Sequence, residues 1–268
     1  MKKEEIIKSN TNIYVIPQTK GGVGKTTISG VIATLLYLQN QNKSINLFEI
    51  DDNNNSKVNS NYINYQSLKL KDSEIVIDDI QFASLSDGNV VNTIDCGGGN
   101  DTKVILQKLK DIDLSGLNYY LPLNDDIEQV SNIKETIFLI RDFDKDANIN
   151  LVLNRCFSLE KNEICKQFIN IFGSDELDIP NQLNTLKVDN VFFVPNSNLF
   201  SILKSHYKVS LLDSYLSSLD LVSNIDTYRQ EWVKEGQEVF KANNKRYRFA
   251  KMVVELIEQL KPIQKALL

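Results

Sequence analysis

Histidine, cysteine and long apolar runs are scarce in this chain. Of its 268 residues, one is histidine and three are cysteines, none of which form a C-x-x-C pair. These counts exclude a site built on several histidines and a disulfide scaffold, and they argue against a zinc site. The longest apolar run, residues 31–38, is far shorter than the ~20 residues that span a bilayer.

The chain begins with charged residues of both signs, and no apolar segment follows them, so we expect no signal peptide. With the unpaired cysteines, this predicts a cytoplasmic protein. Hydrophobic residues make up 42% of the chain, which is enough for a substantial core. The net charge is −5, but residues 225–268 hold nine Lys and Arg against six Asp and Glu. This C-terminal segment is therefore basic and leaves room for a positively charged face.

Strand-like and helix-like segments alternate along the chain. We expect strands at residues 12–17, 44–50, 74–77, 90–94, 117–123, 148–153 and 191–194. Helical segments between them indicate right-handed βαβ crossovers, and hence an α/β fold with a mostly parallel twisted sheet flanked by helices. We interpret residues 1–268 as a single domain, in which 209–268 form a helical C-terminal extension.

The C-terminal extension has its own apolar pattern. An amphipathic helix is indicated by apolar residues at helical spacing: Phe249, Met252, Val253, Leu256, Ile257 and Leu260. Trp232 lies in another expected helix, and we predict that it packs against the sheet. Ligands of parallel sheets bind at the carboxyl ends of the strands, where this sequence places Lys20, Asp51 and Asp95.

A glycine-rich loop between the first expected strand and its helix is the strongest functional signal. Its glycines allow backbone N–H groups to surround phosphates, and the helix N-terminus adds its dipole. Lys25 is placed to reach the β- and γ-phosphates, and the Thr26 hydroxyl to bind Mg²⁺. The predicted nucleotide-binding loop consists of Gly21, Gly22, Val23, Gly24, Lys25, Thr26 and Thr27.

The run K-G-G-V-G-K-T-T at residues 20–27 resembles the phosphate loop of the ParA/MinD group of deviant Walker A ATPases. The resemblance covers most of residues 10–210. It implies a P-loop NTPase fold, ATP and Mg²⁺ as cofactors, slow ATP hydrolysis stimulated by a partner, and a nucleotide-sandwich homodimer. In such a dimer Lys20 would reach the phosphates bound to the other subunit, where a second cation would stabilise the transition state.

Two strand ends supply carboxylates. Asp51 occupies the position of the family's water-orienting aspartate, so the expected catalytic residues are Lys20, Lys25 and Asp51. Asp52 is its rival for that role, since both aspartates follow the second strand. Asp95 ends a strand of Walker B type. With Thr26 and Asp51 it completes the expected set of Mg²⁺ ligands.

Later segments resemble the family's base-binding positions. Asn154 ends a strand where related ATPases place an asparagine on the adenine ring, and an amide can both donate to and accept from adenine. Pro195 and Asn196 correspond to the start of the I-P-R-x-x-x-L stretch that borders the base, although Asn196 replaces the arginine. A structural role at a strand end is the alternative for Asn154.

The resemblance leaves the cargo open. We expect a partition ATPase of ParA type that binds non-specific DNA on the nucleoid and works with an adaptor or centromere-binding protein. The residues expected to contact DNA are Lys245, Arg246, Arg248 and Lys251, for which a solvated helix face is the alternative. Other interpretations are a conjugation accessory ATPase of TraL type, a MinD-like positioning protein, and a nucleotide-switched binding module with negligible turnover. A membrane partner is disfavoured because Pro262 and acidic residues interrupt the C-terminal helix.

Overall fold

The computed structural model describes residues 12–52, 58–86 and 88–267. Seven strands form one sheet in the order β3-β2-β4-β1-β5-β6-β7, and every pairing between neighbouring strands is parallel. The expected α/β fold is thus confirmed. The strands are β1 (Ile13–Ile16), β2 (Ser44–Ile50), β3 (Ile63–Leu68), β4 (Val90–Cys96), β5 (Asn118–Leu123), β6 (Asn148–Cys156) and β7 (Asn190–Pro195).

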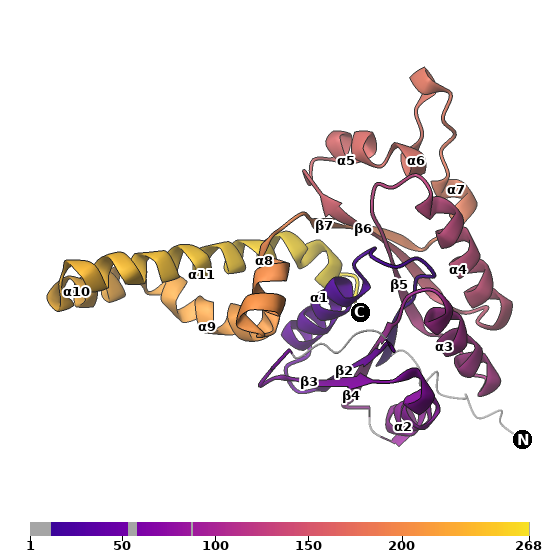
Figure 1. Cartoon of the computed structure of the whole chain (residues 1–268), viewed down its shortest axis with the longest axis horizontal. Helices are drawn as coiled ribbons and strands as arrows, with labels where there is room; N and C mark the ends of the chain where they lie inside the picture. Colours follow the sequence, from indigo (N-terminus) through magenta and orange to yellow (C-terminus); the bar gives the residue numbers. More distant parts are fainter. Residues whose placement is uncertain (1–11, 53–57, 87, 268) are drawn as a thin grey trace, which may run out of the picture.

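Helices cover both faces of the sheet (Figure 1). One face is covered by α2 (Ser73–Ser86), α3 (Asn100–Asp111), α4 (Gln129–Phe143), α5 (Lys161–Gln167), α6 (Ile169–Phe172) and α7 (Leu183–Leu186). The other is covered by α1 (Lys25–Gln39), α8 (Leu199–Ser201), α9 (Leu211–Ser223) and the C-terminal half of α11 (Gln237–Gln264). Short helical segments are η2 (Leu70–Asp72), η3 (Asp175–Leu177) and the π-helix η4 (Ile202–Tyr207).

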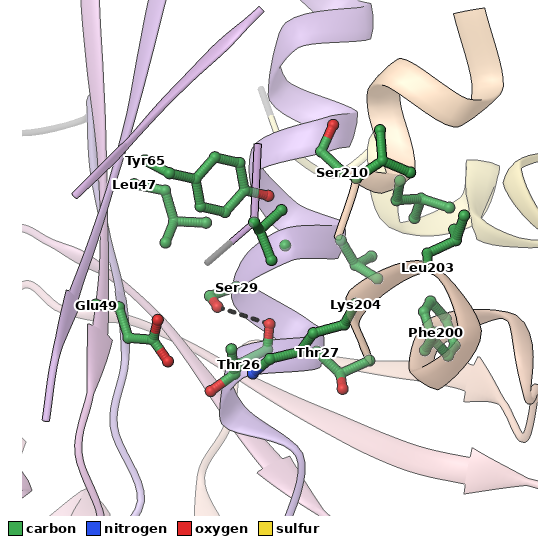
Figure 2. A pocket seen from close by; sticks show the side chains of 15 residues that line it. Thr26, Thr27, Ser29, Leu47, Glu49, Tyr65, Phe200, Leu203, Lys204 and Ser210 are labelled. Atoms are coloured by element: carbon green, nitrogen blue, oxygen red, sulfur yellow. Dashed lines mark hydrogen bonds between the residues drawn. The ribbon is translucent and has the colours of Figure 1, made fainter. Parts of the chain in front are cut away.

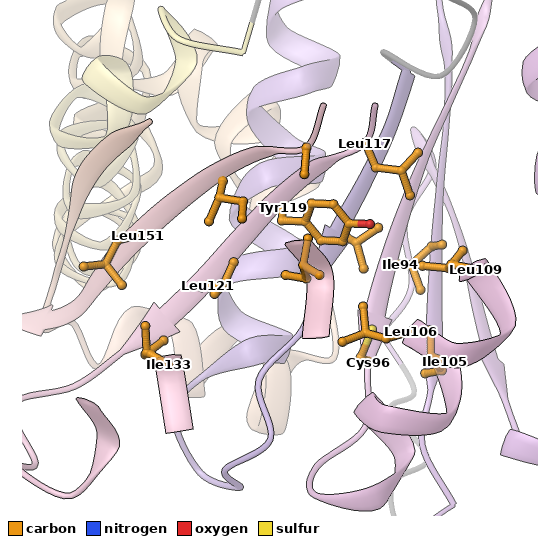
Figure 3. Packing of buried hydrophobic residues seen from close by; sticks show 14 of the residues in the cluster. Ile94, Cys96, Ile105, Leu106, Leu109, Leu117, Tyr119, Leu121, Ile133 and Leu151 are labelled. Carbon is orange, nitrogen blue, oxygen red and sulfur yellow. The ribbon is translucent and has the colours of Figure 1, made fainter. Parts of the chain in front are cut away.

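Each face has its own apolar core. Figure 3 shows the core on the α3 and α4 side, to which Leu106 and Leu109 of α3, Ile94 of β4 and Leu121 of β5 all belong. Cys96 belongs to this core and is 1% exposed. Its burial raises the pKa of the thiol, which makes Cys96 a small packing residue rather than a reactive one.

One strand prediction was wrong and one strand was missed. Residues 74–77 belong to α2, not to a strand: its buried side chains recur at Ser73, Val76, Ile77, Ile80 and Ser84, which is helical spacing. The unpredicted strand is β3, which lies at one edge of the sheet and carries one buried, three half-buried and two exposed side chains. An edge strand of mixed polarity lacks the continuous apolar run of a central parallel strand.

The C-terminal helices form an arm that extends away from the sheet (Figure 1). It consists of the C-terminal end of α9, α10 (Ile225–Glu235) and the N-terminal half of α11. With 28 residues, α11 is roughly 42 Å long at 1.5 Å per residue. Its buried face from Val253 to Ile263 packs against the sheet side that also carries α1, so the arm and the sheet share a core.

Two details of the arm differ from prediction. Met252 is 51% exposed and lies outside the buried face of α11. Trp232 does not pack against the sheet: it lies between Tyr228 and Phe240, with ring centroids 6.0 and 6.5 Å away. The tryptophan is 7% exposed and forms the centre of a small aromatic cluster that joins α10 to α11. Across the described residues, every helix falls short of the length and apolar character needed to cross a membrane.

Candidate phosphate-binding cleft

The carboxyl ends of β1, β2 and β4 meet at an open cleft of about 530 Å³. Strands β2 to β4 lie on one side of β1 and strands β5 to β7 on the other, and ligands of such sheets bind where the strand order reverses. The cleft brings together nine residues predicted from the sequence: Lys20, Gly21, Gly22, Gly24, Lys25, Thr26, Thr27, Asp51 and Asp95. Val23, the tenth residue expected in this region, is fully buried beneath the loop.

The conformation of the glycine-rich loop depends on Gly24. This residue is the N-cap of α1 and has a φ of 97°, in the left-handed region that favours glycine. A Cβ on Gly24 would also lie 2.1 Å from the Asn154 side-chain nitrogen. The loop therefore turns directly into the N-terminus of α1, whose first residues face the cleft.

Lys25 holds the inner end of the cleft. Its side chain is mostly buried, and its Nζ donates to the backbone oxygens of Gln18 and Lys20, each at 3.2 Å. Burial lowers the pKa of the Lys25 ammonium, while the nearby Asp95 carboxylate opposes that shift. The amine thus lies beside the loop backbone. When phosphate binds, it can donate to phosphate oxygens in place of these backbone carbonyls.

Asp95 is the most unusual acid of the cleft. It is 2% exposed, and the β2–β4 register places Glu49, another buried acid, directly beside it. Burial and the Glu49 charge raise the pKa of Asp95 to about 7, whereas the hydroxyls of Thr26 and Ser29 favour its ionised form. Although these hydroxyls lie nearby, neither Asp95 oxygen has a hydrogen bond of ordinary geometry within the described residues.

These carboxylate oxygens fit a bound cation. A buried carboxylate with unsatisfied oxygens, beside a threonine hydroxyl and a phosphate-binding loop, is suited to Mg²⁺, which also takes phosphate oxygens and waters as ligands. No group of three or more His, Cys, Asp or Glu side chains with metal-binding geometry occurs among the described residues. A Mg²⁺ ion here would therefore be held jointly by the protein and its nucleotide.

The two rival aspartates point to different places. Asp51 lines the cleft, whereas the Asp52 carboxylate accepts a hydrogen bond of 2.9 Å from the backbone N–H of Leu70. The Asp52 carbonyl also accepts from Lys69 Nζ at 2.7 Å. Asp52 therefore ties the end of β2 to the segment before α2, and Asp51 is the aspartate that lines the cleft.

Lys20 lies at the rim. Its side chain is 43% exposed, and its Nζ is 3.9 Å from a carboxylate oxygen of Glu128, which is itself 82% exposed. An ion pair this open to solvent contributes little stability. The amine is thus directed toward the start of α4, and it can leave Glu128 at little energetic cost.

The expected base-binding residues line a neighbouring groove. Asn154, Pro195 and Asn196 border a groove of about 350 Å³ that begins at Thr27. The Asn154 amide is already engaged, since its Nδ2 donates to the Val23 carbonyl and its Oδ1 accepts from the Arg155 backbone N–H, both at 2.9 Å. Asn154 therefore braces the phosphate loop, and its contact with adenine stays a prediction.

An apolar cavity lies behind the loop (Figure 2). It shares Thr26, Thr27 and Glu49 with the cleft and is otherwise lined mainly by apolar side chains of β2, α1 and residues 200–211. In Figure 2 the Ser29 hydroxyl donates to the Thr26 carbonyl, which fixes the first turn of α1. The cavity separates the phosphate loop from the π-helix η4.

Two charged residues of the cleft carry no role in the sequence-based prediction: Glu49 and Arg155. Glu49 lies two residues before Asp51, so a charged residue in a buried strand was the available signal. Arg155 gave no sequence signal, because the feature that distinguishes it is its backbone conformation.

The four expected DNA-binding residues lie on the arm and do not form one row. Lys245 and Arg248 line the same surface hollow on α11, whereas Arg246 lines a different one beside Trp232. Lys251 is paired with Glu255 at 3.5 Å. The cations that share an exposed face with Lys245 are therefore Lys241 and Arg248.

The strand–loop–helix order, the parallel sheet and the cleft above the loop define the fold of the P-loop NTPases. No protein-family model and no curated protein matches the sequence. Solved structures similar to the chain include MinD of Aquifex aeolicus, at 15% identity over 75% of this chain and 89% of that one, with a TM-score of 0.49. The cell division ATPase MinD of Pyrococcus furiosus is 17% identical over 92% and 98%, with a TM-score of 0.46.

A protein of Borrelia burgdorferi assigned to plasmid partition, bound to AMPPNP, is 14% identical over 74% of this chain and 90% of that one, with a TM-score of 0.47. The similar structures thus include members of the ParA/MinD group that the phosphate loop resembles. At these identities and scores, the likeness supports no argument about activity or partners, which must come from the cleft itself.

Proposed function

We propose that the protein is a Mg²⁺-dependent ATPase of ParA/MinD type that switches its interactions with the state of its nucleotide. The observation that carries this proposal is the convergence of Lys25, Thr26, Asp51 and Asp95 on one cleft above a glycine-rich loop. Phosphoryl transfer needs a cation that binds the phosphates, ligands for Mg²⁺ and a group that orients the attacking water. Here the cation is a lysine, the Mg²⁺ ligands are a hydroxyl and a buried carboxylate, and the water-orienting group is a second carboxylate.

Each residue has a separate task in this mechanism. The loop amides and Lys25 bind the phosphates and neutralise their charge. Thr26 and Asp95 hold Mg²⁺, which when bound draws charge from the transferring phosphoryl group. Asp51 orients the attacking water by accepting its hydrogen bond, while the Gly97–Gly99 segment closes the cleft from the β4 side.

The proposed assembly is a homodimer around two nucleotides. Lys20 supports this because it stands at the rim, half-exposed and only loosely paired with Glu128. Its amine is thus available to a nucleotide bound by a second copy of the chain. In that arrangement each cleft is incomplete until the partner subunit docks, so hydrolysis follows dimerisation.

ATP turnover and nucleotide binding by the purified protein test the proposal. The wild type should bind ADP and ATP in the presence of Mg²⁺ and release phosphate slowly. Lys25→Ala should abolish both, because the phosphates lose their buried cation, whereas Lys187→Ala, an exposed lysine that does not line the cleft, should change neither. Tight binding without any phosphate release would replace the ATPase with a nucleotide-switched binding module. Absence of binding would overturn the proposal.

Non-specific DNA is the cargo that we propose for the ATP-bound state, with an adaptor protein that stimulates hydrolysis. Lys241, Lys245 and Arg248 support it, since they share one exposed face of α11 on an arm that extends beyond the sheet (Figure 1). A MinD-like membrane helix has less support, because the apolar face of α11 from Val253 to Ile263 is buried in the core.

DNA binding across a salt series, with a slowly hydrolysed ATP analogue, tests this cargo. Lys245→Ala/Arg248→Ala should lower the slope of log K against log salt by about 2, because two phosphate contacts are lost. Arg246→Ala is the matched control, since Arg246 lines a different hollow. Failure of the wild type to bind DNA, while it dimerises with the analogue, would favour a conjugation accessory ATPase of TraL type.

A further inference from the structure

Arg155 stands where the phosphate cleft meets the groove beside it. Of the residues that line the cleft, two also line the groove: Thr27 and Arg155. A nucleotide whose outer phosphates lie at Lys25 and whose base lies in the groove must pass between these two residues. The portion that passes there contains the sugar and the phosphate attached to it.

The backbone of Arg155 adopts a conformation that non-glycine residues rarely take. Its φ is 62°, and it lies at the irregularity of the β6–β7 pairing between Leu153 and Cys156. Strained conformations of this kind persist when neighbouring groups fix them, and they cluster at functional sites. The strained backbone therefore marks Arg155 as a candidate functional residue.

Two side chains hold this conformation in place. Asn154 Oδ1 accepts from the Arg155 N–H at 2.9 Å, and Gln167 Nε2 donates to the Arg155 carbonyl at 3.0 Å. The Asn154 amide simultaneously donates to the Val23 carbonyl of the phosphate loop. The backbone of Arg155 is thus fixed relative to the loop, at a position that lines both the cleft and the groove.

The guanidinium itself is uncommitted within the described part of the chain. Arg155 is exposed, and among the ion pairs of residues 12–52, 58–86 and 88–267 none involves it. A planar guanidinium binds phosphate oxygens through two parallel hydrogen bonds, which an ammonium cannot do. A strained position occupied by an unpaired arginine therefore fits an anionic ligand.

We propose that Arg155 binds the phosphate nearest the sugar of the nucleotide held in the same subunit, and so distinguishes nucleotides from inorganic phosphate. This inference rests on the proposed nucleotide-binding function. The α-phosphate is the anionic group that reaches the junction, because Lys25 and the loop take the outer phosphates. Arg155 thereby joins the phosphate cleft to the base groove across a bound nucleotide.

Binding of a fluorescent ADP analogue, and its displacement by unlabelled ADP and by inorganic phosphate, tests the proposal. Arg155→Gly should weaken ADP binding by about tenfold, because hydrogen bonds between two charged groups are lost. Inorganic phosphate, which fills only the position at Lys25, should bind the variant as it binds the wild type. Arg155→Lys should give an intermediate ADP affinity, since it keeps the charge without the paired hydrogen bonds.

Thermal unfolding separates ligand binding from a structural role. Glycine adopts a φ of 62° without strain, so the thermal midpoint of Arg155→Gly should equal or exceed that of the wild type while its ADP affinity falls. Lys187→Gly is the matched control: Lys187 is an exposed cation with a φ of 50° that precedes β7 at the opposite end of the sheet. It should show the same stability change and unaltered ADP binding.

The contrary outcomes are distinct. Unchanged ADP affinity in Arg155→Gly overturns the inference, and so does an equal loss for ADP and inorganic phosphate, which would mean that Arg155 acts through Asn154 on the loop. If the wild type binds no nucleotide at all, the proposed function fails and this inference fails with it.

Discussion

At the scale of single residues, the cleft stores an unfavourable charge. Asp95 and Glu49 are adjacent and buried, and the nearby charge of Lys25 offsets this arrangement only in part, so it costs free energy in the ligand-free protein. In the proposed function, Mg²⁺ would supply further positive charge beside these acids. A ligand that binds only the folded state raises the free energy of unfolding by RT ln(1 + [L]/Kd), so Mg²⁺-nucleotide should stabilise the protein increasingly as its concentration exceeds Kd.

The pH dependence of stability reveals this stored charge. Because burial raises the pKa of Asp95 from 3.8 to about 7, the folded state holds a proton that the unfolded state releases, and stability falls as pH rises from about 4 to about 7. Asp95→Asn removes that loss and should stabilise the ligand-free protein on the order of 2 kcal/mol at pH 8, and less at pH 5.5. Thermal unfolding at both pH values measures the difference.

The same variant should fail to bind Mg²⁺-nucleotide, because an amide is a poor ligand for Mg²⁺ beside phosphate. Higher stability combined with lost function is the pattern expected of a residue kept for its ligand. A constant gap between Asp95→Asn and the wild type across this pH range would show that Asp95 titrates at its ordinary pKa.

Asp51 and Asp52 should differ in kind. Asp51→Asn should lower ATP turnover by about 100-fold or more, since it removes the group that orients water, while nucleotide affinity changes little. Asp52→Ala should retain turnover and lose about 1 kcal/mol of stability, because the Leu70 N–H loses the side-chain oxygen that accepts its hydrogen bond. Single-turnover kinetics with direct binding measurements separates the two, and equal losses of turnover would contradict the assignment.

Among single residues, most of those that the sequence placed at the cleft lie close together along the chain. The roles of Lys25, Thr26 and Gly24 lie within one contiguous motif, so the sequence alone was enough to place them at the cleft. Glu49 was missed because its neighbour Asp95 is brought to it by strand pairing, 46 residues further along the chain. Arg155 was missed because a positive φ in a strand has no sequence signal when the residue is not glycine.

At the scale of elements, apolar periodicity predicted the central strands and failed at the edge. β1 and β5 are buried for most of their length, and continuous apolar runs revealed them. The half-polar edge strand β3 gave no such run, and residues 74–77, predicted as a strand, belong to α2, whose buried side chains follow helical spacing. Which side chains face a core depends on neighbours that a short window does not contain.

The aromatic cluster of the arm is an element-scale test. Trp232→Ala should destabilise the arm by about 3 kcal/mol, because a buried ring that packs against Tyr228 and Phe240 is removed. Hydrogen exchange should therefore accelerate within residues 225–249, while ADP affinity stays at the wild-type value, since the cleft lies at the sheet. Val233→Ala is the control, because Val233 is 65% exposed. Loss of ADP binding in Trp232→Ala would mean that the arm and the cleft unfold together.

At the scale of the whole molecule, the arm and the cleft have to communicate if nucleotide state controls a cargo. The structure offers one physical connection: α11 leaves the arm, buries its C-terminal half on the face that also carries α1, and α1 begins in the phosphate loop. A shift of the loop when phosphate binds can therefore reach the arm through packed helices. Dimerisation would add a second route, because it sets the arms of two subunits relative to each other.

The proposed dimer makes a quantitative prediction when two inactive variants are mixed. Lys20→Ala and Asp51→Asn should each lack stimulated turnover. In a mixed dimer, the cleft of the Lys20→Ala subunit keeps its own Asp51 and receives Lys20 from the Asp51→Asn partner, so one cleft is complete. Random pairing of equal amounts yields half mixed dimers with one active cleft of two, and hence roughly a quarter of wild-type activity.

If Lys20 serves its own subunit, every cleft in the mixture lacks a required group and no activity returns. Phosphate release measured against the mixing ratio decides between these outcomes. The ion pair between Lys20 and Glu128, at 3.9 Å and open to solvent, is weak enough for Lys20 to leave it and reach the cleft of the partner subunit.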